Sequence, residues 1–144
     1  MDTETQTLNE CRQSFREAQT IRKEKFMKTF DHISRNIELI YKEMTRSAKN
    51  HNFGGTALLY ADDNIEPYNG GINYSPTPPG KRCMYEMDEL SGGEKTIAAL
   101  SLLFAIHSAN PAPFYILDEV DAHLDWENCA LLLKYINKIA TEST

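Results

Sequence analysis

Residues 90–125 read LSGGEKTIAALSLLFAIHSANPAPFYILDEVDAHLD, and this stretch decides the fold. It opens with Ser91 followed three positions later by Glu94, the spacing of a capping box at a helix N-terminus. The pattern predicts a helix that runs to about Ser108 and ends before Pro111. Because apolar residues lie on nearly every face of this helix, we expect it to be buried.

The second half of the stretch predicts a strand and another helix. Residues 114–117 (FYIL) are a short apolar run between Pro113 and an acidic pair, which is typical of a strand buried on both faces of a parallel sheet. Asp125 is then expected to cap a final helix over residues 126–140.

The region before this stretch, residues 51–89, is rich in turn formers and lacks a helical period. Residues 57–60 (ALLY) predict a short strand, and residues 68–71 (YNGG) predict a turn. The returning strand is expected over residues 71–74. Residues 75–80 (SPTPPG) cannot lie in a central strand, since proline donates no ladder hydrogen bond, so we expect them at an edge or in a loop.

The N-terminal part predicts a long helix. Residues 5–48 contain neither proline nor glycine, and apolar residues recur there at steps of three and four. The first stripe consists of Leu8, Cys11, Phe15, Ala18 and Ile21, and its first four residues have the spacing of about two coiled-coil heptads. The second stripe consists of Phe26, Phe30, Ile33, Ile37, Ile40 and Met44. We expect a helix whose first part leaves the globular body and whose second part packs onto it; the alternative is one or two ordinary surface helices.

Charge and composition bound the function. Residues 1–50 carry ten Lys and Arg against eight Asp and Glu, whereas residues 51–144 carry five against thirteen. The net charge of −6 argues against a chain that mainly coats nucleic acid. The composition, 41% hydrophobic and 25% charged over 144 residues, predicts one globular domain with an appendage.

Three scattered cysteines predict neither a disulfide framework nor a zinc site, and favour a reducing compartment. The longest apolar run is too short to span a membrane, and the first residues lack a signal-peptide pattern.

Two motifs carry chemistry. Ser91, Gly92 and Gly93 at a helix start offer a hydroxyl and free amides to an anion; the alternative is a plain helix cap. Asp118 and Glu119, after an apolar strand, have the Walker B pattern, in which Asp serves magnesium and Glu the attacking water. The alternative for this pair is a solvated acidic turn. We do not expect a dedicated metal cage, although acidic and histidine residues alternate at Asp118, Asp121, His123 and Asp125.

Together, with 27 positions between Ser91 and Asp118, these motifs and the DAHLD segment at 121–125 resemble the signature motif, Walker B motif and D-loop of ABC-type ATPases. Within that superfamily the chain resembles the SMC family of chromosome-organising ATPases. The matching segments are LSGGEK at 90–95, PAPF at 111–114 and LDEVDA at 117–122. The segments that resemble the type-one, cohesin-type branch of the family are EPY at 66–68, GINY at 71–74 and PGKR at 79–82.

The resemblance implies an α/β fold, the C-terminal lobe of an ABC-type (P-loop NTPase) head with a leading coiled-coil helix and a small β-hairpin region. Residues 1–50 would be the end of the coiled coil and the neck helix, and residues 51–144 the lobe, incomplete at its C-terminus. A transporter nucleotide-binding subunit is the alternative, although transporters usually carry Gln at the position of Glu94 and Pro at that of Val120. A degenerate, non-catalytic interaction module is a further alternative.

The resemblance also implies the roles of the site residues in a site built with a second head. The signature residues that meet ATP of the opposite head would be Leu90, Ser91, Gly92, Gly93, Glu94 and Lys95. Asp118 would serve Mg²⁺ through water, and Glu119 would be catalytic. The D-loop interface residues would be Asp121, Leu124 and Asp125. The implied cofactors are ATP and Mg²⁺.

The implied partners are the N-terminal lobe of the same head, a partner SMC head, the winged-helix domain of a kleisin subunit and, through the assembled complex, DNA. The implied location is the chromosome in the nucleus, with no membrane association. The chain has no G-x-x-x-x-G-K-[ST] phosphate loop, because Glu94 stands where residues 92–96 (GGEKT) would need glycine. We therefore expect a fragment, an incomplete gene model or a degenerate copy that is inactive alone. His123 also departs from the small residue usual in this D-loop position.

Overall fold

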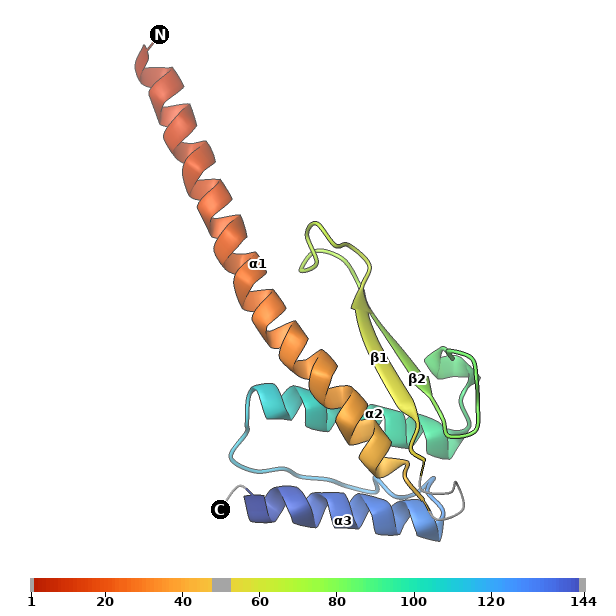
Figure 1. The fold of residues 1–144 in the computed structure, drawn as a ribbon. Helices are drawn as coiled ribbons and strands as arrows, with labels where there is room; N and C mark the ends of the chain where they lie inside the picture. The colour runs from red at the N-terminus through yellow and green to blue at the C-terminus, as the bar shows by residue number, and fades with distance from the viewer. Residues whose placement is uncertain (1, 48–52, 143–144) are drawn as a thin grey trace.

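The computed structural model describes residues 2–47 and 53–142. Figure 1 shows a helix that projects far from a small body made of a hairpin and two further helices. The elements, in chain order, are α1 (Asp2–Met44), β1 (Thr56–Ala61), β2 (Ile72–Thr77), the 3₁₀ turn η2 (Met87–Glu89), α2 (Gly92–Ala109) and α3 (Trp126–Glu142). None of the helices in the described ranges has an apolar stretch that could cross a bilayer.

Helix α1 is a single helix of 43 residues that continues through the step of five between Ile21 and Phe26. Its first half is exposed, with Phe15 at 64% and Ile21 at 53%. Its last turns are buried against the body, where Ile37 and Met44 have no exposed surface. The prediction of a helix that leaves the body and then packs onto it is confirmed. The coiled-coil seam stays a prediction, since the described residues supply no second helix for it.

The core lies where α1, β1, α2 and α3 meet. Each fully buried aliphatic side chain there contributes about 1.5–3 kcal/mol to stability. Its members are Ile37, Ile40, Tyr41, Met44, Ala57, Leu90, Ile97, Ala98, Leu100, Phe104, Ala105, Leu132 and Tyr135. Burial raises the pKa of the Tyr41 hydroxyl far above its ordinary value, with a further contribution from the Glu94 charge.

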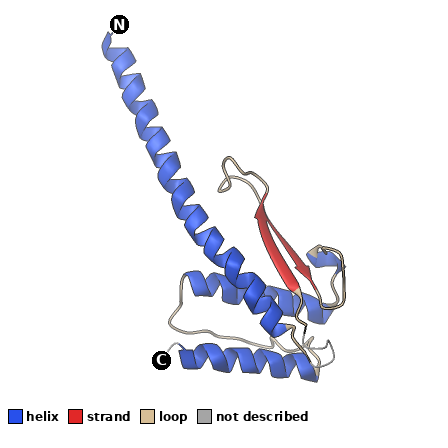
Figure 2. Cartoon of the chain, in the orientation of Figure 1, coloured by secondary structure: helices blue, strands red, loops and turns tan. Residues whose placement is uncertain are grey.

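Strands β1 and β2 form an antiparallel pair, the only sheet in the described part of the chain (Figure 2). The register pairs Thr56 with Thr77 and Ala61 with Ile72. Residues 75–77 therefore lie in an edge strand, which confirms the expectation for this proline-containing segment. The predicted turn is also confirmed, because the amide of Asn69 donates to the carbonyl oxygen of Glu66 at 2.9 Å.

The tip of the hairpin, residues 62–71, contacts α1 some 45 positions earlier in the chain. Gln19 Nε2 donates to Glu66 Oε1 at 2.8 Å, and Lys23 Nζ donates to the carbonyl oxygen of Ile65 at 2.9 Å. The Arg22 guanidinium lies 4.3 Å from the centroid of the Tyr68 ring, a cation–π contact. The hairpin thus braces α1 at the level where the helix leaves the body.

Replacing Glu66 by Ala is expected to loosen this brace, because its carboxylate accepts hydrogen bonds from Gln19, Tyr68 and Asn69. The distribution of distances between spin labels on the outer half of α1 and on α3 should broaden. The thermal midpoint should change little, since exposed polar contacts contribute about 1 kcal/mol or less to the free energy of unfolding. Glu10→Ala is the matched control, because Glu10 accepts a hydrogen bond from Gln6 of the same helix at 3.4 Å, a contact within α1. Equal distance distributions in the two variants would contradict the brace.

Two expectations about the body are wrong. Residues 114–117 form no strand: Phe114 is 72% and Ile116 84% exposed, Tyr115 contacts Phe104 and His107, and Leu117 is half-buried. A buried parallel strand needs neighbouring strands on both sides, and the described residues contain no strand beside this segment. Helix α2 is not buried all round either, because Leu103 and Ile106 are 42% and 48% exposed.

The helices of the body lie where the sequence predicts them. Helix α2 ends at Ala109 and α3 covers Trp126–Glu142, which confirms both predicted helices. The predicted domain boundary between residues 50 and 51 lies outside the described residues.

Candidate functional site

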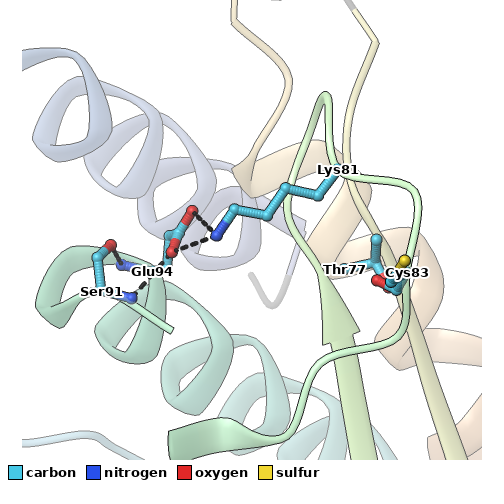
Figure 3. Close-up of polar contacts among 5 residues, drawn as sticks. All are labelled: Thr77, Lys81, Cys83, Ser91 and Glu94. Carbon is cyan, nitrogen blue, oxygen red and sulfur yellow. Dashed lines mark hydrogen bonds and ion pairs between the residues drawn. The ribbon is translucent and has the colours of Figure 1, made fainter. Parts of the chain in front are cut away.

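The start of α2 is a complete capping box, as the sequence predicts. Ser91 is the N-cap residue, and its Oγ accepts from the backbone N of Glu94 at 3.4 Å. In return, Glu94 Oε2 accepts from the backbone N of Ser91 at 2.9 Å. The second bond is shorter and involves a charged acceptor, so it is the stronger half of the box. Figure 3 shows both bonds at the first turn of the helix.

The two glycines that follow leave their amides available. No described residue accepts a hydrogen bond from the backbone N of Gly92 or Gly93, and Gly92 is exposed. These amides point out of the helix N-terminus together with the positive end of its dipole, the arrangement that binds anions. The neighbouring Leu90 is 5% exposed and belongs to the core, so its side chain anchors the segment. The ammonium of Lys95 lies 3.9 Å from a carboxylate oxygen of Asp88.

A residue outside the predicted set, Lys81, holds the start of α2. Its Nζ lies 3.1 Å from both carboxylate oxygens of Glu94 (Figure 3). Burial acts to raise the pKa of Glu94, but the bonds from Ser91 and the Lys81 ammonium outweigh it and lower that pKa. Glu94 is therefore ionised at neutral pH, and the stability that this ionisation adds is lost as pH falls through its lowered pKa. The PGKR segment at 79–82 is one of those that carry the resemblance to the SMC family, but nothing in its spacing indicated the contact between Lys81 and Glu94.

The predicted D-loop lies against the glycines of α2. A Cβ atom placed on Gly93 would come within 2.9 Å of the carbonyl oxygen of His123, so a side chain at this position would force that loop to shift. Asp125 caps α3, because its Oδ1 accepts from the backbone N of Asn128 at 2.9 Å.

The signature segment and the D-loop also meet in one cavity of about 210 Å³, to which Gly93, Glu94 and Asp125 contribute. Of the other D-loop residues, Leu124 packs against the core. The backbone carbonyl oxygen of Asp121 accepts from the backbone N of Leu124 at 2.9 Å. The structure thus brings these two predicted motifs together within the one chain.

The acidic pair lies apart from that cavity. Asp118 and Glu119 are both exposed, and neither lines the space between Gly93 and Asp125. Glu119 has a φ of 49°, the only non-glycine residue at positive φ in the described ranges. Such a conformation is strained for a residue with a side chain and is concentrated at functional sites.

No three His, Cys, Asp or Glu side chains converge on a common point in residues 2–47 and 53–142. Asp118 on its own cannot complete a magnesium site. A single carboxylate such as that of Asp118 fits the way Mg²⁺ is bound beside nucleotides, where one or two carboxylates act together with waters and substrate phosphates.

The family model described as RecF/RecN/SMC N terminal domain matches residues 1–143. Among curated relatives, Structural maintenance of chromosomes protein 1 of Schizosaccharomyces pombe is 50% identical over 131 residues, which are 91% of this chain and 10% of that protein. The protein of the same name from Arabidopsis thaliana is 53% identical over 115 residues, 80% of this chain and 9% of the relative. The chain therefore spans about a tenth of the length of the curated relatives it matches.

Solved structures give the same relationship in three dimensions. An Smc head domain from Pyrococcus furiosus, bound to the C-terminal domain of ScpA, matches with a TM-score of 0.79 and 35% identity over 90% of this chain and 31% of that one. A structure described under ATP-driven dimerization and DNA stimulated activation of SMC ATPases matches with a TM-score of 0.70 and 36% identity. That match covers 83% of this chain and 68% of the other.

Proposed function

The chain belongs to the RecF/RecN/SMC family, and from this premise we propose that it forms the C-terminal lobe of a cohesin-type SMC ATPase head. Its similarity to the type-one SMC proteins of fungi and plants supports the cohesin type. In this proposal the chain supplies the signature motif, Walker B motif and D-loop to composite ATP sites, whose occupation drives the engagement of two heads. The cellular outcome is sister-chromatid cohesion or loop organisation of chromosomes in the nucleus.

The observation that carries the proposal is the free N-terminus of α2. Ser91 and the amides of Gly92 and Gly93 form an exposed anion site, while Glu94 and Leu90 tie the segment to the body. An exposed site of this kind at the surface of a lobe suits a phosphate presented by another molecule. We assign these residues to the γ-phosphate of ATP held on the opposite head, with Lys95 at the edge of the contact.

The acidic pair serves the chain's own half of a site. Mg²⁺ neutralises phosphate charge when it is bound, and Asp118 is the residue of this chain that would hold it, through water. Glu119 follows directly and is assigned to orient and deprotonate the attacking water. Asp118 and Glu119 lie outside the cavity shared by Gly93 and Asp125, which supports our assignment of the two half-sites of one chain to two different ATP molecules.

Exposed apolar side chains support the proposal that another part of the head covers this lobe. Phe114, Ile116 and Trp126 are between 72% and 88% exposed. Large exposed apolar side chains such as Phe114 and Ile116, which lie in one segment, are typical of surfaces that a partner covers. We propose that the N-terminal lobe of the same head covers residues 114–117 and gives them strand neighbours.

The remaining partners follow from the related heads. We propose that Asp121, Leu124 and Asp125 face the partner head. A kleisin winged-helix domain binds the lobe, as the C-winged helix domain of ScpA binds an Smc head. DNA is contacted through the assembled complex.

The isolated 144-residue chain is expected to bind Mg-ATP very weakly and to hydrolyse none, because it has no phosphate loop for the β- and γ-phosphates. Isothermal titration of the pure chain with Mg-ATP tests this expectation. Adding a lobe that carries a G-x-x-x-x-G-K-[ST] motif from the same head should restore binding. Micromolar affinity of the chain alone would contradict the composite site.

A further inference from the structure

Lys81 is presented to α2 by a rigid turn rather than by a flexible arm. Its backbone N donates to the carbonyl oxygen of Pro78 at 3.2 Å, and Gly80 closes the turn with a φ of 82°. The ammonium also lies 4.7 Å from the centroid of the Tyr85 ring. Contacts with both Tyr85 and Glu94 therefore hold a Lys81 side chain that is one-third exposed. Part of the ordering cost of the lysine is met before any ligand arrives.

The carboxylate that Lys81 holds has two functions at once. Glu94 Oε2 accepts from the backbone N of Ser91 at 2.9 Å and also from Lys81 Nζ at 3.1 Å. The same carboxylate places a negative charge beside the free amides of Gly92 and Gly93. An uncompensated charge there would repel a phosphate, which itself carries negative charge. The ammonium of Lys81 offsets that charge and keeps the carboxylate in the capping box.

We propose that Lys81 is a positioning residue for the signature segment, acting through Glu94 on the geometry of Ser91 and on the electrostatic potential at the glycine amides. The inference rests on the proposed function, since it names a residue needed for that same anion site. The hairpin thereby has two attachments, its tip at α1 and the turn after β2 at the start of α2.

The test uses complete heads that contain this segment, with Lys81→Met as the main variant. Sedimentation as a function of head concentration measures ATP-dependent dimerisation. Lys81→Met should weaken it about tenfold, the effect of losing a charge-assisted hydrogen bond. Lys81→Arg keeps the cation and should retain dimerisation within about threefold. Lys138→Met is the matched control, because Lys138 makes a similar exposed ion pair with Glu43 at 2.8 Å, between α3 and α1.

Two further measurements separate positioning from simple stability. Hydrogen exchange of the hydrogen-bonded amides of Ser91, Glu94 and Lys95 should accelerate in Lys81→Met and not in Lys138→Met. Adding Glu94→Gln to Lys81→Met should recover part of the lost dimerisation, since Gln keeps the capping box and removes the repelling charge. Should Lys81→Met not fold, Lys81→Gln replaces it in the same assays.

The outcomes are distinguishable. Equal dimerisation and equal exchange in the parent and Lys81→Met would overturn the role of Lys81, and so would an equal loss in Lys138→Met. If the parent heads do not dimerise with ATP, the proposed function fails. The exchange of those three amides then still decides whether Lys81 positions the segment.

Discussion

Replacing Glu119 by Gln in a complete head is expected to reduce ATP turnover by about 100-fold or more, the contribution of a general base in enzymes. The amide keeps the size of the side chain but neither takes a proton from water nor supports developing positive charge on it. ATP binding and head engagement should persist, because the phosphates are bound by other residues. Steady-state phosphate release and sedimentation with ATP measure the two quantities on one preparation.

The matched control is Glu38→Gln, which removes the same charge from an exposed position on α1. Its turnover should equal that of the parent. The backbone of Glu119 has positive φ, and we expect Gln at this position to keep the same conformation, so the substitution should leave that strain unchanged. Turnover of Glu119→Gln within twofold of the parent would remove Glu119 from the catalytic role.

Replacing Ser91 by Arg is expected to abolish ATP-dependent engagement of two heads, and with it hydrolysis. The guanidinium and its long side chain would fill the space where the phosphate of the opposite head must meet the amides of Gly92 and Gly93. ATP affinity of the head's own site should hardly change, because that site uses other residues. Light scattering with and without ATP measures engagement, and titration with ATP measures affinity.

A plain helix cap predicts a different result for the same variant. Loss of the N-cap hydroxyl costs about 0.5–2 kcal/mol of stability and leaves engagement intact. The long 3.4 Å bond from Glu94 N to Ser91 Oγ indicates a cost toward the lower end of that range. Thr141→Arg adds the same charge to an exposed position of α3 and serves as the control. A Ser91→Arg head that melts earlier yet still dimerises with ATP would show that Ser91 is only a cap.

The features that sequence determined by itself are those decided within a few turns of chain. The absence of proline and glycine and the apolar period were enough for α1. Ser91 with Glu94 was enough for the start of α2, and Asp125 was enough for the start of α3. Caps and helical periods depend on residues three or four positions apart, so they are readable without tertiary structure. The signature, Walker B and D-loop assignments likewise rest on residue order and spacing, and the roles of these residues stay predictions.

Tertiary structure alone decided the contacts between segments that are distant in the chain. The ion pair of Lys81 with Glu94, the approach of His123 to Gly93 and the contact of Glu66 with Gln19 each join separate elements. The apolar run at 114–117 shows the opposite case, because its composition favours a strand that no neighbour pairs in the described residues. A strand is completed by hydrogen bonds to another strand, whereas a helix supplies its own. Local sequence therefore specified the helices, and only packing between elements decided which residues surround the start of α2 and which apolar segment is left exposed.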